Sequence, residues 1–337
     1  MLLIAAGFYF GGGEGSAGHR ISVDPVDVSA SVKITNHGAA DETRTQLLDF
    51  IWPQGKLPGE MTIRDMKHPS LAAYPAQMWT VTMPHGVVSR SFFFDSGGSD
   101  CLFLWHDGHY RRPVTEAPAA LELSARMLRD GCDVLLLSMP LYGVNADPVL
   151  SDHDELAQFE SPTFSPIAYF MEPAAQALDE ALARKPYSRV GMGGLSGGGW
   201  STVLFAALDQ RITHMYSVAG SMPFEVDIDP DVAGLITSSA RGDYEQSYAP
   251  LYDIAGYLDL YLLGAQNRSA KHIYISADQC CFPPELMAAF APELETYAAD
   301  VVGGYLSFLR DSAATQHELS GWAIDVITND FFDGPSS

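Results

Sequence analysis

Two patterns of apolar and polar positions divide this chain of 337 residues. Before residue 95, the stretches 78–83 and 87–94 are rich in β-branched and aromatic residues and flank Pro84-His85-Gly86, which predicts a β-hairpin. After residue 100, short apolar runs alternate with amphipathic segments. The expected strands are 101–105, 133–137, 212–218, 272–277 and 305–309, and the expected helices are 118–129, 166–184, 285–298 and 321–331. This alternation predicts an α/β fold with a doubly wound, mostly parallel sheet.

The chain is long enough to bury a large core, so we expect one α/β domain with insertions. Residues 1–86 form an N-terminal extension with the first strands, and residues 87–337 form the main domain. Within the extension, 21–34 alternates enough to suggest a strand, and 43–51 fits a short helix or strand.

Two inserts interrupt the alternation. Residues 141–164 are a polar stretch without periodicity, and residues 222–266 are too long for a simple crossover. The second insert carries five tyrosines on helix-like segments: Tyr244, Tyr248, Tyr252, Tyr257 and Tyr261. A tyrosine stripe is more often core packing than a ligand surface. Its place between two strands that flank the candidate site nevertheless makes this insert the expected helical cap.

The most informative stretch is 188–200, in which a short apolar run is followed by a cluster of glycines and then by the start of an expected helix. Gly194-Leu195-Ser196-Gly197-Gly198 fits the pattern G-x-S-x-G, the nucleophile elbow. A strand that turns at once into a helix strains the backbone at the serine and leaves no room for a Cβ on either side. The helix N-terminus then points its N–H groups at an anion formed beside Ser196.

A serine hydroxyl is a poor nucleophile at neutral pH and needs a base, with a third group that orients the base. Of the ten histidines, His317 alone lies in a loop after both Ser196 and the last expected strand. Asp278 follows the strand 272–277 directly and is the leading candidate for the acid. The fallback acids follow the preceding strand: Asp227, Asp229 and Asp231. The order Ser, Asp, His is the one this elbow requires.

A tetrahedral intermediate needs two N–H donors for its oxyanion. We expect one from Gly197 and the other from the turn after the strand 101–105, where Gly108 permits close approach and His109 is the leading donor. Tyr110 and Trp200, which lie beside these turns, are expected to contact substrate. The run 106–109 could also be interpreted as a metal-binding cluster, but it lacks further ligands of clear spacing, so we expect no metal site.

From about residue 87 to residue 332, the chain resembles the α/β-hydrolase superfamily. The resemblance rests on the strand into His106-Asp107-Gly108-His109, the elbow around Ser196, Asp278 after a late strand, and His317 before the closing helix. It implies that residues 87–337 are a catalytic domain that hydrolyses carboxylic esters through an acyl-serine intermediate, with neither a metal nor an organic cofactor. A serine peptidase or acyltransferase would use the same machinery, and a non-catalytic member of the fold could serve as a binding module.

Composition limits the partners and the compartment. The chain is 47% hydrophobic and 18% charged, with a formal net charge of −23 from 19 basic and 42 acidic residues. Because phosphate binding needs a basic face, we expect no nucleic-acid partner. The resemblance implies a small or polymeric ester substrate instead. The apolar run 1–10 is a poor signal peptide as written, which leaves membrane association open and favours a secreted or extracytoplasmic protein weakly. Cys101 and Cys132 are expected to be buried thiols, and either Cys280 or Cys281 could join a disulfide.

Overall fold

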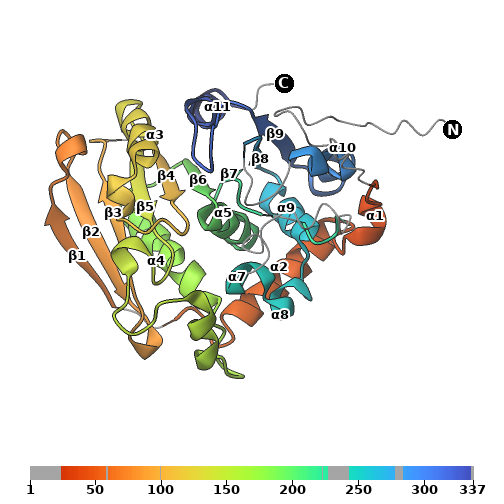
Figure 1. Cartoon of the computed structure of the whole chain (residues 1–337), viewed down its shortest axis with the longest axis horizontal. Helices are drawn as coiled ribbons and strands as arrows, with labels where there is room; N and C mark the ends of the chain where they lie inside the picture. Colours follow the sequence, from red (N-terminus) through yellow and green to blue (C-terminus); the bar gives the residue numbers. More distant parts are fainter. Residues whose placement is uncertain are drawn as a thin grey trace, which may run out of the picture.

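A nine-stranded sheet forms the centre of the molecule in the computed structural model, which describes residues 24–57, 60–98, 100–221, 223–226, 243–277 and 284–334 (Figure 1). Its spatial order is β1-β2-β3-β5-β4-β6-β7-β8-β9. The strands are β1 (Glu60–Met66), β2 (Ala76–Thr82), β3 (Val88–Phe94), β4 (Cys101–His106), β5 (Asp133–Leu137), β6 (Arg189–Leu195), β7 (His214–Val218), β8 (Ser269–Ile275) and β9 (Tyr305–Asp311). The strands from β5 to β9 run parallel, whereas β1, β2 and β3 pair antiparallel, as does β3 with β5. The predicted mostly parallel sheet is therefore confirmed.

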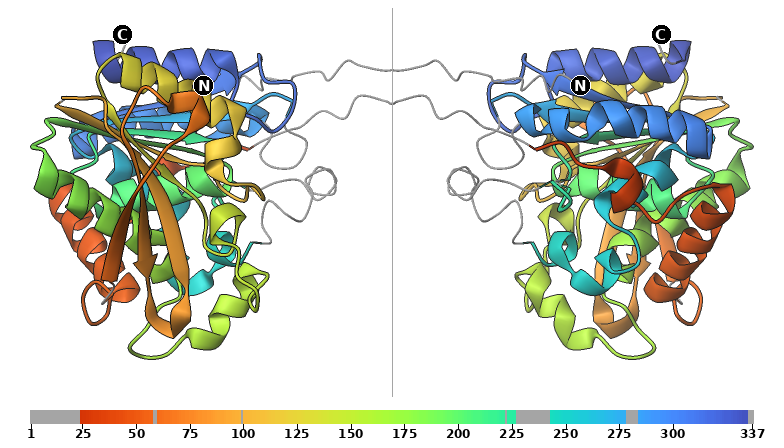
Figure 2. Two further views of the ribbon diagram at one scale, coloured as in Figure 1. Left: turned by 90° about the vertical axis from the view of Figure 1, so that its left-hand side faces the viewer. Right: turned by 90° about the vertical axis from the view of Figure 1, so that its right-hand side faces the viewer.

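Helices cover both faces of this sheet (Figure 2). They are α1 (Val28–Ser31), α2 (His37–Ile51), α3 (Pro118–Arg129), α4 (Ala168–Arg184), α5 (Gly197–Leu208), α7 (Tyr244–Ser247), α8 (Ala249–Tyr252), α9 (Tyr257–Ala265), α10 (Ala291–Tyr297) and α11 (Gly321–Asp333). The apolar sides of α3 and α11 share one core cluster, and those of α2, α4, α5 and α9 share the other. Because both faces are covered, every residue of β4 and β5 is buried, as their continuous apolar runs predict.

Two local predictions are wrong, and one strand was not predicted. The described part of 21–34 contains the short helix α1 instead of a strand, because the Asp27 side chain accepts the N–H of Ala30 and starts a helical turn. Strand β1 was not predicted, since its residues are almost all exposed and lack a buried face. The single helix expected over 285–298 is divided into a 3₁₀ helix (Pro284–Ala289) and α10, with Phe290 in a non-helical conformation between them.

The two inserts lie against the body of the protein as short helical pieces. The first contains the 3₁₀ helices Gly143–Asn145 and His153–Phe159, and the described part of the second contains α7, α8 and α9. Tyr257 and Tyr261 are fully buried, so these tyrosines pack in the core. No helix in the described part of the chain combines the length and apolarity needed to cross a membrane. The apolar run 1–10, like Cys280 and Cys281, lies outside the described residues.

Cys101 and Cys132 form a disulfide, which corrects the expectation of two free buried thiols. Cys101 opens β4, and Cys132 immediately precedes β5. These strands are parallel neighbours whose register pairs Leu102 with Asp133, so the two cysteines lie side by side with their Cα atoms 4.9 Å apart. That distance lies within the range over which a disulfide can form.

Removal of this disulfide should destabilise the protein. The bond closes a loop with a sequence separation of 31, and loss of such a cross-link increases the conformational entropy of the unfolded chain. We expect the Cys101→Ser/Cys132→Ser double variant to lose about 2–4 kcal/mol of unfolding free energy, measured by urea denaturation. Wild-type protein unfolded in the presence of a reductant should match the variant. Equal stability of the oxidised wild type and the variant would contradict the prediction.

Candidate active site

Ser196 is the residue at which β6 ends and α5 begins. Its backbone has φ of 60° and ψ of −128°, a combination that a non-glycine residue adopts only under strain. Its N–H donates to the carbonyl oxygen of Val218 on the neighbouring strand at 2.9 Å, which fixes the bend to the sheet. The strand, sharp turn and helix predicted around this serine are therefore present.

Glycine is required on both sides of the bend because the backbone passes too close to other backbone. A Cβ added to Gly194 would lie 2.3 Å from the carbonyl oxygen of Gly198. A Cβ added to Gly198 would lie 2.0 Å from the carbonyl oxygen of His106 and 2.7 Å from the amide nitrogen of Gly108. The bend at Ser196 is thus in direct backbone contact with the turn that follows β4.

The turn after β4 holds the predicted oxyanion residues beside the start of α5. A Cβ added to Gly108 would lie 3.1 Å from the amide nitrogen of Gly197, so the two turns are in contact. The Gly197 N–H is the first of α5 and lacks an acceptor within the helix. The Gly108 N–H donates to His106 Nδ1 at 3.3 Å, which occupies it within its own turn. The N–H of His109 stays the predicted second donor.

Ser196 and His317 line the same cavity, which has a volume of about 490 Å³. Asp107, His109 and Tyr110 line it as well, from the turn after β4. The remaining wall is made of small apolar and polar residues: Ala117, Pro118, Ala119, Ala120, Leu195, Gln316, Glu318 and Leu319. Residues far apart in the sequence therefore line one cavity together with the serine of the predicted nucleophile elbow.

Trp200, predicted to contact substrate, does not reach this cavity. Its side chain is fully buried in α5, packs edge-on against Phe170, and donates its indole N–H to the Tyr252 hydroxyl at 2.8 Å. Helix α5 is buried over its whole length, so proximity to Ser196 in sequence does not bring a side chain to the cavity.

The loop that carries His317 is braced by Asp311, a residue that the sequence analysis did not single out. Asp311 ends β9 and is fully buried. One carboxylate oxygen accepts the N–H groups of Ala313 and Ala314, and the other accepts the Ser320 hydroxyl at 2.6 Å. Ser320 in turn caps α11. Asp311 therefore fixes both ends of the loop between β9 and α11.

The acid of the expected triad stays a prediction. Strand β8 ends at Ile275, three positions before Asp278, and Asp278 lies outside the described residues. The fallback candidates Asp227, Asp229 and Asp231 also lie outside them. The position of Asp278 after β8, the strand adjacent to β9, is the feature that supports it.

Burial controls the charge of the turn after β4. Desolvation lowers the pKa of His106 to about 3, so this ring is neutral and accepts the Gly108 N–H. Desolvation likewise raises the pKa of Asp107 to about 7, although a hydrogen bond from the Trp105 indole partly opposes the shift. Below that pH a protonated Asp107 adds no negative charge beside the position where an oxyanion would form.

His109 also belongs to a cluster that the sequence analysis missed. Its Nε2 lies 3.3 Å from Nδ1 of His153 in the first insert and 3.2 Å from Oε1 of Glu245 in the second insert. Burial alone would raise the pKa of Glu245, but the neighbouring His109 and His153 imidazoles lower it to about 2. His153 and Glu245 come from inserts without periodicity, so no sequence signal connected them with His109.

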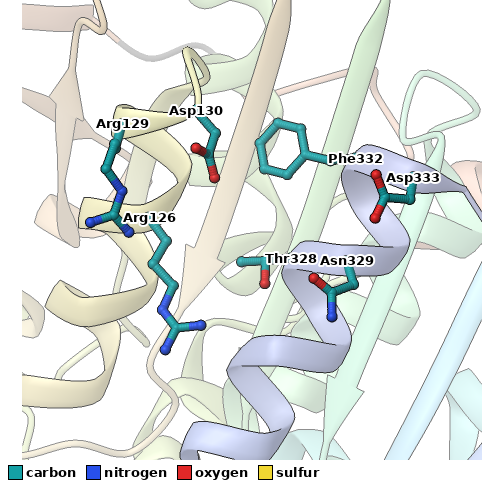
Figure 3. Close-up of a pocket in the computed structure, with 7 residues that line it drawn as sticks. All are labelled: Arg126, Arg129, Asp130, Thr328, Asn329, Phe332 and Asp333. Carbon is teal, nitrogen blue, oxygen red and sulfur yellow. The ribbon is translucent and has the colours of Figure 1, made fainter.

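A second hollow, of about 400 Å³, lies between α3 and α11 (Figure 3). Its lining is mostly polar and charged: Arg126, Arg129, Asp130, Thr328, Asn329, Phe332 and Asp333. These residues include no serine, cysteine or histidine, so the hollow has no counterpart of Ser196 or His317.

Comparison with solved structures identifies the fold as that of the α/β-hydrolases. The alignment with the methylesterase BT1017 covers 91% of this chain and 68% of that protein, with a TM-score of 0.64 at 17% identity. The alignment with acetyl xylan esterase 1 from a Thermoanaerobacterium species covers 91% of this chain and 97% of that protein, with a TM-score of 0.57 at 15% identity. The alignment with a glucuronoyl esterase from Solibacter usitatus covers 87% of this chain and 92% of that protein, with a TM-score of 0.59 at 12% identity. These neighbours are carboxylic ester hydrolases by name. No protein-family model and no curated protein sequence matches the chain.

Replacement of Gly198 by alanine should disrupt the elbow. The added Cβ would meet the His106 carbonyl and the Gly108 amide, both of which are backbone groups, so the two turns must separate. We expect a loss of about 100-fold or more in hydrolysis of an activated ester, because displacement by about 1 Å can have that effect. Gly321→Ala is the matched control, since nothing lies within 4 Å of its added Cβ. Equal activity of the two variants would contradict the close contact.

Proposed function

We propose that this protein is a serine esterase that hydrolyses carboxylic esters through an acyl-serine intermediate. In the first step, the Ser196 oxygen attacks the ester carbonyl while His317 takes the hydroxyl proton. His317 then gives that proton to the departing alcohol as the carbon–oxygen bond breaks. In the second step, water loses a proton to His317 and attacks the acyl carbonyl. His317 then returns that proton to the Ser196 oxygen as the bond between this oxygen and the acyl carbon breaks, which releases the acid and free Ser196. Asp278 orients the His317 ring and stabilises its charged form.

The observation that carries this proposal is the strained serine facing one cavity together with His317. The positive φ of Ser196 is kept only because the surrounding backbone enforces it, and such strain accumulates at functional sites. The first N–H of α5 and the turn after β4 supply oxyanion donors at the same place. A glycine-rich turn without chemistry would not need a histidine from the loop after β9 in the same cavity.

The cavity lining supports a short acyl group. Ala117, Ala119 and Ala120 make part of the cavity wall small and apolar, whereas Gln316 and Glu318, the sequence neighbours of His317, add polar groups to it. A volume of about 490 Å³ fits a small acyl group with part of its alcohol. One structural neighbour acts, by its name, on acetylated xylan. We infer that the substrate is a short acyl ester, either a small molecule or an ester carried on a polymer.

The disulfide supports an extracytoplasmic location. Disulfides persist in oxidising compartments and are reduced in most cytosols. Cys101 and Cys132 are both buried and join two central strands, so the bond belongs to the core of the fold. We propose that the protein is secreted or otherwise held outside the cytoplasm.

Ser196→Ala and His317→Ala should each remove almost all ester hydrolysis. Because nucleophile and base act as a unit, each variant should lose about 10⁵-fold or more in kcat, measured with p-nitrophenyl acetate. Ser188→Ala and His37→Ala, both at exposed positions, are the matched controls and should keep full activity. Retained turnover in Ser196→Ala would overturn the proposal.

The acid can be identified by comparing Asp278→Asn with Asp311→Asn. We expect Asp278→Asn to lower kcat by about 10⁴-fold without a change in melting temperature, because it loses only the orientation of the base. Asp311→Asn should instead destabilise the fold by about 1–3 kcal/mol, because a buried hydrogen-bonded carboxylate that braces the β9–α11 loop is lost. Stability and kcat are measured on the same preparations. Wild-type kcat in Asp278→Asn would exclude it as the acid.

Two further measurements separate this function from its alternatives. Matched ester and amide substrates distinguish an esterase from a serine peptidase, which would cleave both. A serine-reactive organophosphonate probe distinguishes an enzyme from a binding module on the same fold. Folded wild-type protein should become labelled at Ser196, and absence of labelling would favour the binding module.

A further inference from the structure

Three side chains from three separate segments converge beside the elbow. His109 comes from the turn after β4, His153 begins the 3₁₀ helix of the first insert, and Glu245 lies in α7 of the second insert. His109 Nε2 lies 3.3 Å from His153 Nδ1 and 3.2 Å from Glu245 Oε1, while His153 Nδ1 lies 2.9 Å from Glu245 Oε2. One nitrogen of each ring and the carboxylate therefore face a common point.

The hydrogen bonds in this cluster leave one buried acceptor unused. Glu245 is fully buried, and no donor in the described part of the chain has hydrogen-bond geometry toward its Oε1, although His109 Nε2 is only 3.2 Å away. A buried carboxylate oxygen without a donor is costly. His109 Nε2 and Glu245 Oε1 thus lie close together without a hydrogen bond between them, which is how two ligands of one metal ion are placed.

The surroundings of the cluster also resemble those of a metal centre. His153 Nε2 lies 2.8 Å from the carbonyl oxygen of Pro140, so it donates its proton there and leaves Nδ1 as a lone-pair donor. Metal-bound histidines usually donate their second ring N–H in this way. The Tyr142 ring packs edge-on against both imidazoles, and Phe170 packs edge-on against His153. These rings hold the ligands in place and limit access of water.

We propose that His109, His153 and Glu245 form a site for a single zinc ion. Ligands 2.0–2.1 Å from a tetrahedral zinc ion are separated from one another by about 3.3 Å. The two ring nitrogens are 3.3 Å apart, and one ligand atom from each of the three residues lies within 4.8 Å of the other two. Two imidazoles with one carboxylate are a recognised zinc ligand set. The fourth position falls to water or to Asp243, whose Oδ2 lies 3.9 Å from His109 Nε2.

Zinc at this place would join both inserts to the oxyanion turn. The imidazole of His109 lies against Gly197, because a Cβ added there would be 2.6 Å from the ring. A bound ion would fix this ring from its other side and with it the backbone of the turn. His109 would then be a positioning residue for the site around Ser196, with the ion in a structural role. This inference does not depend on the proposed esterase activity.

Metal binding can be tested without any substrate. Protein stripped with a chelator is titrated with Zn²⁺ by calorimetry in a large excess of Mg²⁺, which occupies non-specific acidic sites. We expect one tightly bound zinc ion per chain and a rise in melting temperature of about 5 °C at saturation. Co²⁺ in place of Zn²⁺ should give the strong visible absorption of a tetrahedral site. Folded wild-type protein that binds no zinc beyond the Mg²⁺-competed background would overturn the proposal.

Substitutions of the proposed ligands test where the zinc ion binds. His153→Gln and Glu245→Gln should each abolish stoichiometric zinc binding and the thermal shift, while His37→Gln at an exposed position should keep both. If His153→Gln and Glu245→Gln fail to fold, the test rests on the Co²⁺ spectrum of the wild type. Absence of tetrahedral absorption in that spectrum contradicts the site. Zinc retained in both folded variants would place the ion elsewhere and overturn the assignment. Stoichiometric binding of another transition metal in preference to zinc would overturn the identity of the ion.

Discussion

Direct contact between two backbone turns determines the geometry of this protein's candidate active site. The elbow at Ser196 and the turn after β4 touch with no side chain between them, since Gly198 leaves room for the His106 carbonyl and for the Gly108 amide. Parallel pairing of β4 with β6 brings the two turns to the same edge of the sheet. Ser196, the N-terminus of α5 and the turn at Gly108 are therefore positioned relative to one another by main-chain packing.

Local patterns predicted the central fold because each of its elements has its own signal. The buried runs that became β4 and β5, and the amphipathic run that became α3, were found with nearly correct bounds. Elements whose formation depends on distant partners were missed. β1 exists because β2 supplies its hydrogen bonds, although its own residues bury no face. The disulfide likewise depends on the register between β4 and β5, which neither cysteine's local sequence reveals.

Prediction of the candidate site followed the same division. Ser196, His317 and the turn after β4 were predicted to lie together because the fold prescribes their order and each follows a strand, and they do line one cavity. Trp200 was misplaced because closeness in sequence to the nucleophile says little on a helix that is buried on all sides. His153 and Glu245 are 92 positions apart and both lie in irregular inserts, so only the folded chain reveals that they meet at His109.

The exposed strand β1 has a consequence for how copies of this protein behave toward one another. One edge of the nine-stranded sheet ends there, with unpaired main-chain groups that could extend a neighbouring sheet. Exposed Arg64 and Asp65 sit on that edge, and a second copy that added a strand would have to strip water from both charges. With a formal net charge of −23, two copies also repel each other at a distance. The exposed residues that prevented the prediction of β1 therefore also oppose the addition of a strand from a second copy.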